Sequence, residues 1–122
     1  MIERRWFRSG CLAAVFFMAA ALFVGAETAA EIPLFPPPFD KAAHFGYFLA
    51  MSLLAFAGLG ARFWWTAIPV LIAIGAADEL HQLTVPGRHG SVWDFVADAL
   101  GVLVAVWIMA RPAGLKDDGP IN

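Results

Sequence analysis

Four long apolar segments occupy most of this chain, and they limit its possible folds more than any other feature. They cover about residues 11–26, 45–59, 63–77 and 92–110 of the 122. With 61% hydrophobic residues and a mean hydropathy of +0.71, the chain is more apolar than a soluble domain, in which roughly half of the residues are apolar. The segments therefore predict transmembrane helices.

The two middle segments are short for this purpose, since each has 15 residues and a spanning helix needs about 20. They reach that length only if the second helix begins at Asp40 and the third continues to Leu83. The polar residues at these ends are then helical and lie near the membrane surface. We predict an all-α fold, a four-helix transmembrane bundle that uses most of the chain and leaves no room for a second domain.

The expected organisation follows from these segments. Residues 1–26 form an amino-terminal transmembrane helix or signal anchor, 27–39 a proline-rich outer loop, 40–110 a three-helix core, and 111–122 a cytoplasmic tail. Arginines before the first segment and Val24-Gly25-Ala26 at its end also resemble a cleavable signal peptide. We expect the helix to be retained, because its apolar run is long and rich in phenylalanine.

The distribution of Lys and Arg predicts the orientation. If the amino terminus is cytoplasmic, six of the eight basic residues lie inside: Arg4, Arg5, Arg8, Arg62, Arg111 and Lys116. Only Lys41 and Arg88 then lie outside. Because cytoplasmic loops carry an excess of basic residues, we expect both termini in the cytoplasm.

Polar and ionisable residues gather at the expected outer ends of the last three helices. They are Asp40, Lys41, His44, Tyr47, Asp78, Glu79, Gln82, Arg88, Asp94 and Asp98. Ionisable groups at membrane depth are costly and usually face the bundle interior or a water-filled cavity. We therefore interpret these ten residues as one outward-facing polar site.

At the start of the second helix, Asp40, His44 and Tyr47 follow one another at spacings of four and three. Such spacings place side chains on one helix face. Asp40 also fits an N-cap, and Lys41 could extend its ammonium to lipid headgroups. His44 has no capping role and is the stronger candidate for function.

Asp78 and Glu79 are adjacent carboxylates at the carboxyl end of the third helix. The helix dipole is negative there, so each carboxylate is disfavoured by a few tenths to about 1 kcal/mol. We expect cationic partners to converge on this pair from Lys41, Arg88 or the histidines.

In the fourth helix, Ser91 and Asp94 have the spacing of a capping box. Asp98 lies one turn deeper on the same face, where it has to be paired, hydrated or protonated. Gly101 and Ala105 form a small-xxx-small pair, which allows another helix to approach closely.

Together these motifs resemble the VanZ-like family of small membrane proteins over about residues 39–106. The matching residues are Asp40-Lys41-x-x-His44-Phe45 with Tyr47, Asp78-Glu79-x-x-Gln82, Pro86-Gly87-Arg88 with Gly90-Ser91, and Asp94 with Gly101. At Asp98 the family pattern more often has asparagine, and at Ala105 a glycine is frequent. An acid at position 98 adds a charge or a proton that relatives lack, so no shared role is carried over to it.

The resemblance implies a multi-pass protein of the bacterial cytoplasmic membrane. The family is named after a member associated with low-level resistance to the glycopeptide teicoplanin, which implies a possible link to antibiotic resistance. The resemblance implies no particular reaction.

Three functional interpretations remain open. The outward-facing site binds an anionic cell-envelope or lipid-linked molecule, or the charges form an ion network that locks the helices of an accessory protein, or His44 and Asp98 carry protons in transport. If there is chemistry, His44 or Glu79 is the general base. No convincing nucleophile is present, because Ser91 has a capping role, so enzymatic activity and catalytic residues are left unassigned.

The partners expected are a membrane lipid or cell-envelope precursor and, if the protein oligomerises, a second copy. A net charge of −2 gives no reason to expect nucleic-acid binding. We expect no cofactor and no metal, since the spacing of the histidines and acids matches no compact ligand motif. Cys11 is the single cysteine, so no intramolecular disulfide forms.

Overall fold

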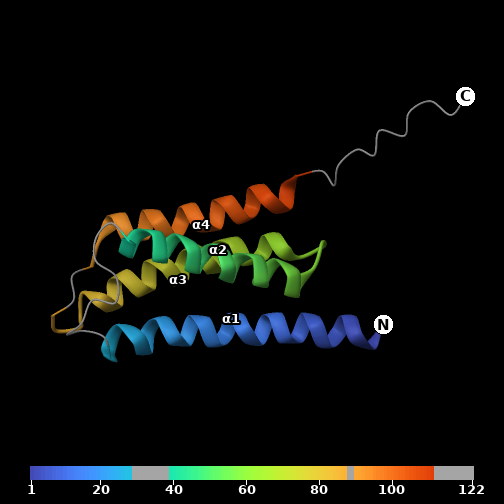
Figure 1. Cartoon of the computed structure of the whole chain (residues 1–122), viewed down its shortest axis with the longest axis horizontal. Coiled ribbons are helices and arrows are strands. Elements are labelled where there is room, and N and C mark those ends of the chain that lie inside the picture. The colour runs from blue at the N-terminus through green and yellow to red at the C-terminus, as the bar shows by residue number, and fades with distance from the viewer. Residues whose placement is uncertain (29–38, 88–89, 112–122) are drawn as a thin grey trace, which may run out of the picture.

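A computed structural model describes residues 1–28, 39–87 and 90–111, most of which are helical, with no strand among them (Figure 1). The elements are α1 (Ile2–Thr28), α2 (Phe39–Leu59), a 3-10 turn (Trp64–Thr66), α3 (Ala67–Gln82) and α4 (Val92–Ala110). The predicted all-α, four-helix fold is confirmed.

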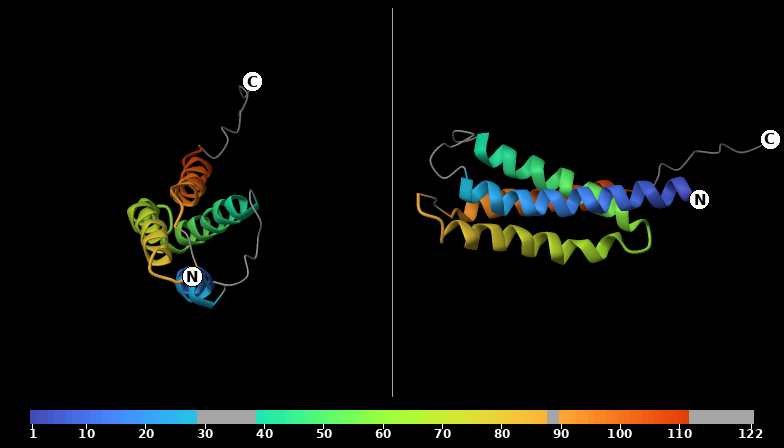
Figure 2. Two further views of the ribbon diagram at one scale, coloured as in Figure 1. Left: turned by 90° about the vertical axis from the view of Figure 1, so that its left-hand side faces the viewer. Right: turned by 90° about the horizontal axis from the view of Figure 1, so that it is seen from below.

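The four helices run alternately up and down (Figures 1 and 2). The start of α1, the turn between α2 and α3, and the end of α4 lie at one end of the bundle. The start of α2, the end of α3 and the start of α4 lie at the other end. The polar ends of the last three helices therefore meet.

Helix α2 is central, and its most extensive contacts are with α4 and then α1, while α3 packs mainly against α4. Phe48, Met51 and Ala55 lie on one face of α2 at spacings of three and four, and all are buried. Leu71 of α3 and Val102 of α4 complete the same core. This apolar core lies next to the polar helix ends, toward the middle of the bundle.

The small residues Gly101 and Ala105 of α4 face α2 of the same chain. Gly101 and Ala105 are buried, and a Cβ placed on Gly101 would lie 2.5 Å from the backbone oxygen of Phe45. Such a separation is far below van der Waals contact, so only glycine permits this approach. The close helix approach expected from the sequence thus occurs within the chain.

Helix α1 is fastened to α2 by two sets of hydrogen bonds. Arg8 Nε donates to the Gly58 carbonyl oxygen at 2.8 Å, and Arg8 Nη2 donates to that of Leu59. Further along, the Tyr47 hydroxyl donates to the Met18 carbonyl oxygen at 2.7 Å. These bonds make α1 part of the bundle.

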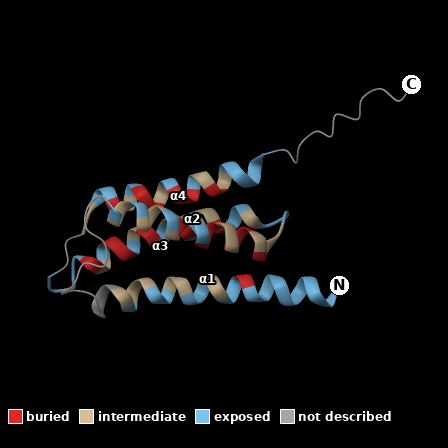
Figure 3. Ribbon diagram, in the orientation of Figure 1, coloured by how far each residue is buried: buried red, intermediate tan, exposed pale blue. Residues whose placement is uncertain are grey.

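Three helices are long and apolar enough to span a membrane, within Ile2–Gly25, Phe39–Leu59 and Val92–Ala110. Helix α3 has 16 residues and reaches about 24 Å at 1.5 Å per residue, less than the ~30 Å of a hydrocarbon core. The expected fourth span is shorter than predicted because the chain forms a 3-10 turn before α3. The outer surface is largely exposed (Figure 3) and carries large apolar side chains such as Phe16 and Trp107.

Candidate functional site

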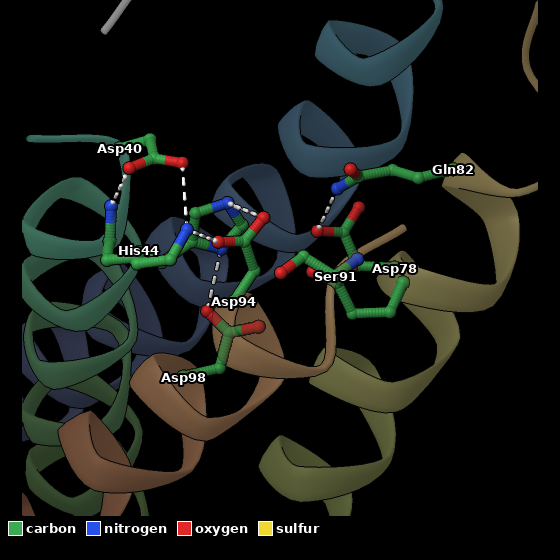
Figure 4. A network of polar contacts seen from close by, with 9 residues as sticks. Asp40, His44, Asp78, Gln82, Ser91, Asp94 and Asp98 are labelled. Carbon is green, nitrogen blue, oxygen red and sulfur yellow. Dashed lines mark hydrogen bonds and ion pairs between the residues drawn. The ribbon is translucent and has the colours of Figure 1, made fainter. Parts of the chain in front are cut away.

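The candidate site is a polar cluster where α2, α3 and α4 meet at one end of the bundle (Figure 4). Its acids are deeply buried for polar groups: Asp78 and Asp98 are each 1% exposed, and Glu79 and Asp94 each 8%. We call these four residues, with Asp40, Lys41, His44 and Gln82, the polar cluster.

Lys41 forms the outer edge of the polar cluster. Its Nζ lies 3.1 Å from Asp40 Oδ2 and 3.1 Å from Asp94 Oδ1. Its side chain remains 39% exposed, whereas that of Asp94 is 11% exposed. An ammonium on α2 is therefore held by a carboxylate of α4 while part of it stays accessible.

His44 connects the same two helices one turn deeper. Its Nδ1–H donates to Asp98 Oδ1 at 2.8 Å, and its Nε2 lies 3.9 Å from Asp94 Oδ2. The sequence required Asp98 to be paired, hydrated or protonated, and it is paired. The partner is a histidine on a neighbouring helix.

The α3 carboxylates receive amide donors. Gln82 Nε2 donates to Asp78 Oδ2 at 3.1 Å, as their spacing of four allows. The Ser91 backbone N–H donates to Glu79 Oε2 at 2.8 Å. Of the cationic partners expected for Asp78 and Glu79, His44 has a ring nitrogen within 4.8 Å of an oxygen of each, whereas Lys41 pairs with Asp40 and Asp94. Its helix turns the ammonium toward α4.

The capping-box interpretation of Ser91 and Asp94 is also wrong for the side chains. Ser91 occupies the N-cap position of α4 but makes no side-chain capping hydrogen bond. Only its backbone oxygen accepts a bond from the Asp94 N–H, at 3.1 Å. The Asp94 carboxylate lies 3.1 Å from Lys41 Nζ instead, and the Ser91 N–H, which a capping box would offer to that carboxylate, donates to Glu79 Oε2.

One predicted site residue, Tyr47, makes its hydrogen bond outside the polar cluster. The Tyr47 hydroxyl is bonded to the Met18 carbonyl oxygen of α1. Arg88, with its neighbour His89, lies outside the described residues. Sequence reasoning did not single out the Ser91 backbone N–H as a partner of Glu79, and no residue type signals such a main-chain contact.

Two buried carboxylate oxygens are not used by these bonds. Glu79 Oε1 and Asp98 Oδ2 have no hydrogen-bond partner among the residues that the structure describes. His44, Asp78, Glu79 and Asp98 each present one possible ligand atom, and the four atoms lie within 4.8 Å of one another. Within the described part of the chain, these four groups could hold a metal ion.

A helical bundle with apolar outer faces and a buried ionic cluster at one end defines a small integral membrane protein. A family model described as VanZ/LLP1 matches residues 12–112, so the chain belongs to the VanZ/LLP1 family. The resemblance found from the motifs is thereby confirmed, and the match extends it to include most of α1. No curated protein and no solved structure shows a significant match to the chain.

Proposed function

We propose that the polar cluster binds an anionic molecule of the cell envelope, such as a lipid-linked phosphate, at the outer surface of the bacterial cytoplasmic membrane. The proposed orientation follows from the basic residues, which are concentrated at the opposite ends of the helices. The cluster then faces the compartment in which cell-wall precursors are handled.

The observation that carries this proposal is the state of Lys41. An ammonium has three N–H donors, and two of them are accounted for by Asp40 and Asp94 at 3.1 Å each. The side chain is still 39% exposed. The acids thus fix the position of a cation whose third donor remains available to a ligand at the membrane surface.

The binding test uses the full chain in detergent micelles, with a polyprenyl phosphate as the probe and the uncharged polyprenol as its control. We expect Lys41→Gln to weaken phosphate binding about tenfold or more, because a hydrogen bond to a charged group is worth about 1.5–3 kcal/mol. Arg62→Gln removes one positive charge from an exposed position at the opposite end and is the matched control. Equal binding of phosphate and alcohol would refute the proposal. Binding to phosphatidylglycerol vesicles is then measured, because it shows whether the protein recognises lipid phosphates in general or the polyprenyl carrier in particular.

The proposed link to glycopeptide resistance can be tested with a variant of the same site. A deletion strain is complemented with the wild type or with Glu79→Gln, and teicoplanin susceptibility and envelope-lipid composition are measured. We expect the variant to behave like the deletion at equal protein levels. Full complementation would remove Glu79 from the functional site.

A second candidate function is a structural one, in which the charges lock the helices together. It is supported by the ion pairs Lys41–Asp94 and His44–Asp98, both of which join α2 to α4. Under this alternative the exchange Lys41→Asp with Asp94→Lys restores folding and the cellular phenotype together. A folded exchange variant that lacks the phenotype favours anion binding.

A further inference from the structure

We propose that His44, Asp78, Glu79 and Asp98 form a binding site for a divalent metal cation inside the polar cluster. They come from three helices: His44 from α2, Asp78 and Glu79 from α3, and Asp98 from α4. One nitrogen or oxygen atom of each lies within 4.8 Å of the other three. The site is separate from the Lys41 ammonium, whose partners are Asp40 and Asp94.

The spacing of these atoms suits a common cation. Ligand atoms on opposite sides of an ion are separated by about twice the metal–ligand distance, or ~4–5 Å for bonds of about 2.1–2.4 Å. The largest separation among the four atoms falls within this range. Small movements of side chains, without movement of helices, would complete the coordination.

Two buried oxygens point independently to a missing ligand. Asp98 is 1% exposed, and its Oδ2 has no hydrogen-bond partner among the described residues. This oxygen is directed toward α3, because it lies 3.4 Å from a Cβ placed on Gly75. Glu79 is 8% exposed, and its Oε1 has no such partner either within the described part of the chain. Buried carboxylate oxygens without partners are costly, and a cation would satisfy both.

The charge balance supports the same conclusion. Within the described residues, the polar cluster contains five carboxyl groups and one permanently cationic side chain, Lys41, and His44 is neutral when it ligates a metal. A divalent ion offsets about half of the negative excess. It also differs from a proton in a testable way, since it binds several of these carboxylates at once.

The ligand types indicate which cations fit. Carboxylates suit Mg²⁺, Ca²⁺ and Mn²⁺, while imidazole suits Zn²⁺ and the transition metals. A set of one imidazole and three carboxylates therefore favours Mn²⁺ or Zn²⁺ over Mg²⁺ and Ca²⁺. The sequence suggested no metal because these ligands converge from three helices, so their spacing along the chain follows no compact motif.

A cation here would also explain how an anion approaches an acidic cluster, and this connection rests on the proposed function. The metal would add positive charge to the cluster that holds Lys41 and so strengthen the attraction of the cluster for a phosphate. The metal site itself depends only on the four ligands and can be tested without any lipid.

The test titrates Mn²⁺ into the metal-stripped full chain in detergent and follows the loss of the free-Mn²⁺ electron paramagnetic resonance signal, with Zn²⁺ as a competitor. We expect one Mn²⁺ per chain and a rise in the unfolding temperature on binding. Asp98→Asn and Glu79→Gln should each weaken binding about tenfold or more, since even residues that only support metal ligands contribute 10–100-fold. Glu3→Gln, on the exposed first turn of α1, is the matched control and should bind like the wild type.

No saturable binding by the folded wild-type protein at millimolar Mn²⁺ would overturn the proposal. So would wild-type affinity in both ligand variants, or a loss in Asp94→Asn equal to that in Asp98→Asn, which would indicate general electrostatic attraction. If Asp98→Asn does not fold, the proposal is decided by the Mn²⁺ affinity of Glu79→Gln and by the change in the wild-type unfolding temperature on Mn²⁺ binding. Polyprenyl phosphate binding is then measured with Mn²⁺ and with a chelator. Metal binding without lipid binding refutes only the proposed function, and chelator-insensitive lipid binding refutes only the connection between the two.

Discussion

His44 on α2 donates a 2.8 Å hydrogen bond to Asp98 on α4, and Asp98 is almost completely buried. A histidine and a carboxylate thereby join two helices whose backbones are in close contact one turn deeper, at Gly101. Because little water reaches Asp98, its bond to His44 is part of the folded structure as well as of the candidate site. The stability of the bundle and the chemistry of the site are therefore coupled at this pair.

Removing His44 should cost more stability than neutralising its partner. His44→Ala leaves the buried Asp98 carboxylate without its main donor, and breaking a buried ion pair in this way costs about 3–5 kcal/mol. Asp98→Asn keeps an oxygen acceptor for the Nδ1–H and should cost much less. Free energies of unfolding measured in mixed detergent micelles compare the two variants. Equal losses would contradict the assigned hydrogen bond.

Gly101→Ala should destabilise the bundle by about 1–3 kcal/mol, the cost of overpacking a tight core. The added Cβ would lie 2.5 Å from the Phe45 oxygen and 2.9 Å from the Leu49 nitrogen, both of which are backbone atoms that cannot rotate away. Gly46→Ala is the matched control, because nothing lies within 4 Å of a Cβ there. It should be neutral or stabilise α2 by roughly 0.5–1 kcal/mol. Thermal unfolding checks both, and a neutral Gly101→Ala would disprove the close approach.

Arg8→Gln should loosen α1 from the end of α2. The substitution removes the donors to the Gly58 and Leu59 carbonyl oxygens, and hydrogen bonds from a charged group contribute about 1.5–3 kcal/mol. Spin-labelled cysteines at the exposed positions Phe7 and Phe63, at the same end of the bundle, would report the separation in a Cys11→Ala background. Arg5→Gln, at an exposed position of α1, is the control. An unchanged distance in Arg8→Gln would mean that apolar packing alone holds α1.

Ser91→Ala should have little effect, whereas Ser91→Pro should be damaging. A true N-cap serine contributes about 0.5–2 kcal/mol, but the Ser91 hydroxyl makes no capping bond. Its backbone N–H, which proline lacks, donates to Glu79 Oε2 at 2.8 Å. Unfolding temperatures of the two variants separate the roles. A large decrease in the unfolding temperature of Ser91→Ala would support the capping-box interpretation.

Much of the architecture could be predicted from the sequence, because hydrophobic segment length and polar segment ends determine helices and their alternation. The meeting of Asp40, His44, Asp94 and Asp98 at one end follows from that alternation alone. The later start of α3 was harder to predict, because the segment from Phe63 is almost entirely apolar. Its start signals are Thr66, the N-cap residue of α3, and Pro69 in the first turn, and neither indicates a 3-10 turn at Trp64–Thr66.

The pairing within the site was harder to predict than its location. Lys41 selects Asp94 rather than Asp78 because the rotation of α2 about its axis is determined by packing, chiefly the contact of Gly101 with Phe45. Spacing along the chain gives the face of one helix but not its rotation relative to a neighbour. For the same reason the approach of His44, Asp78, Glu79 and Asp98 to within 4.8 Å of one another could not be predicted, although their common location was.

The contact between Gly101 and Phe45 also bears on transport through the bundle. Directly beneath the ionic groups the main chains of α2 and α4 touch, and below them Phe48, Met51 and Val102 fill the interior with hydrocarbon. A proton or solute that crosses the bilayer would need a hydrated pathway through these packed side chains. We therefore expect a molecule that binds at the ionic end to leave toward the same membrane surface from which it entered.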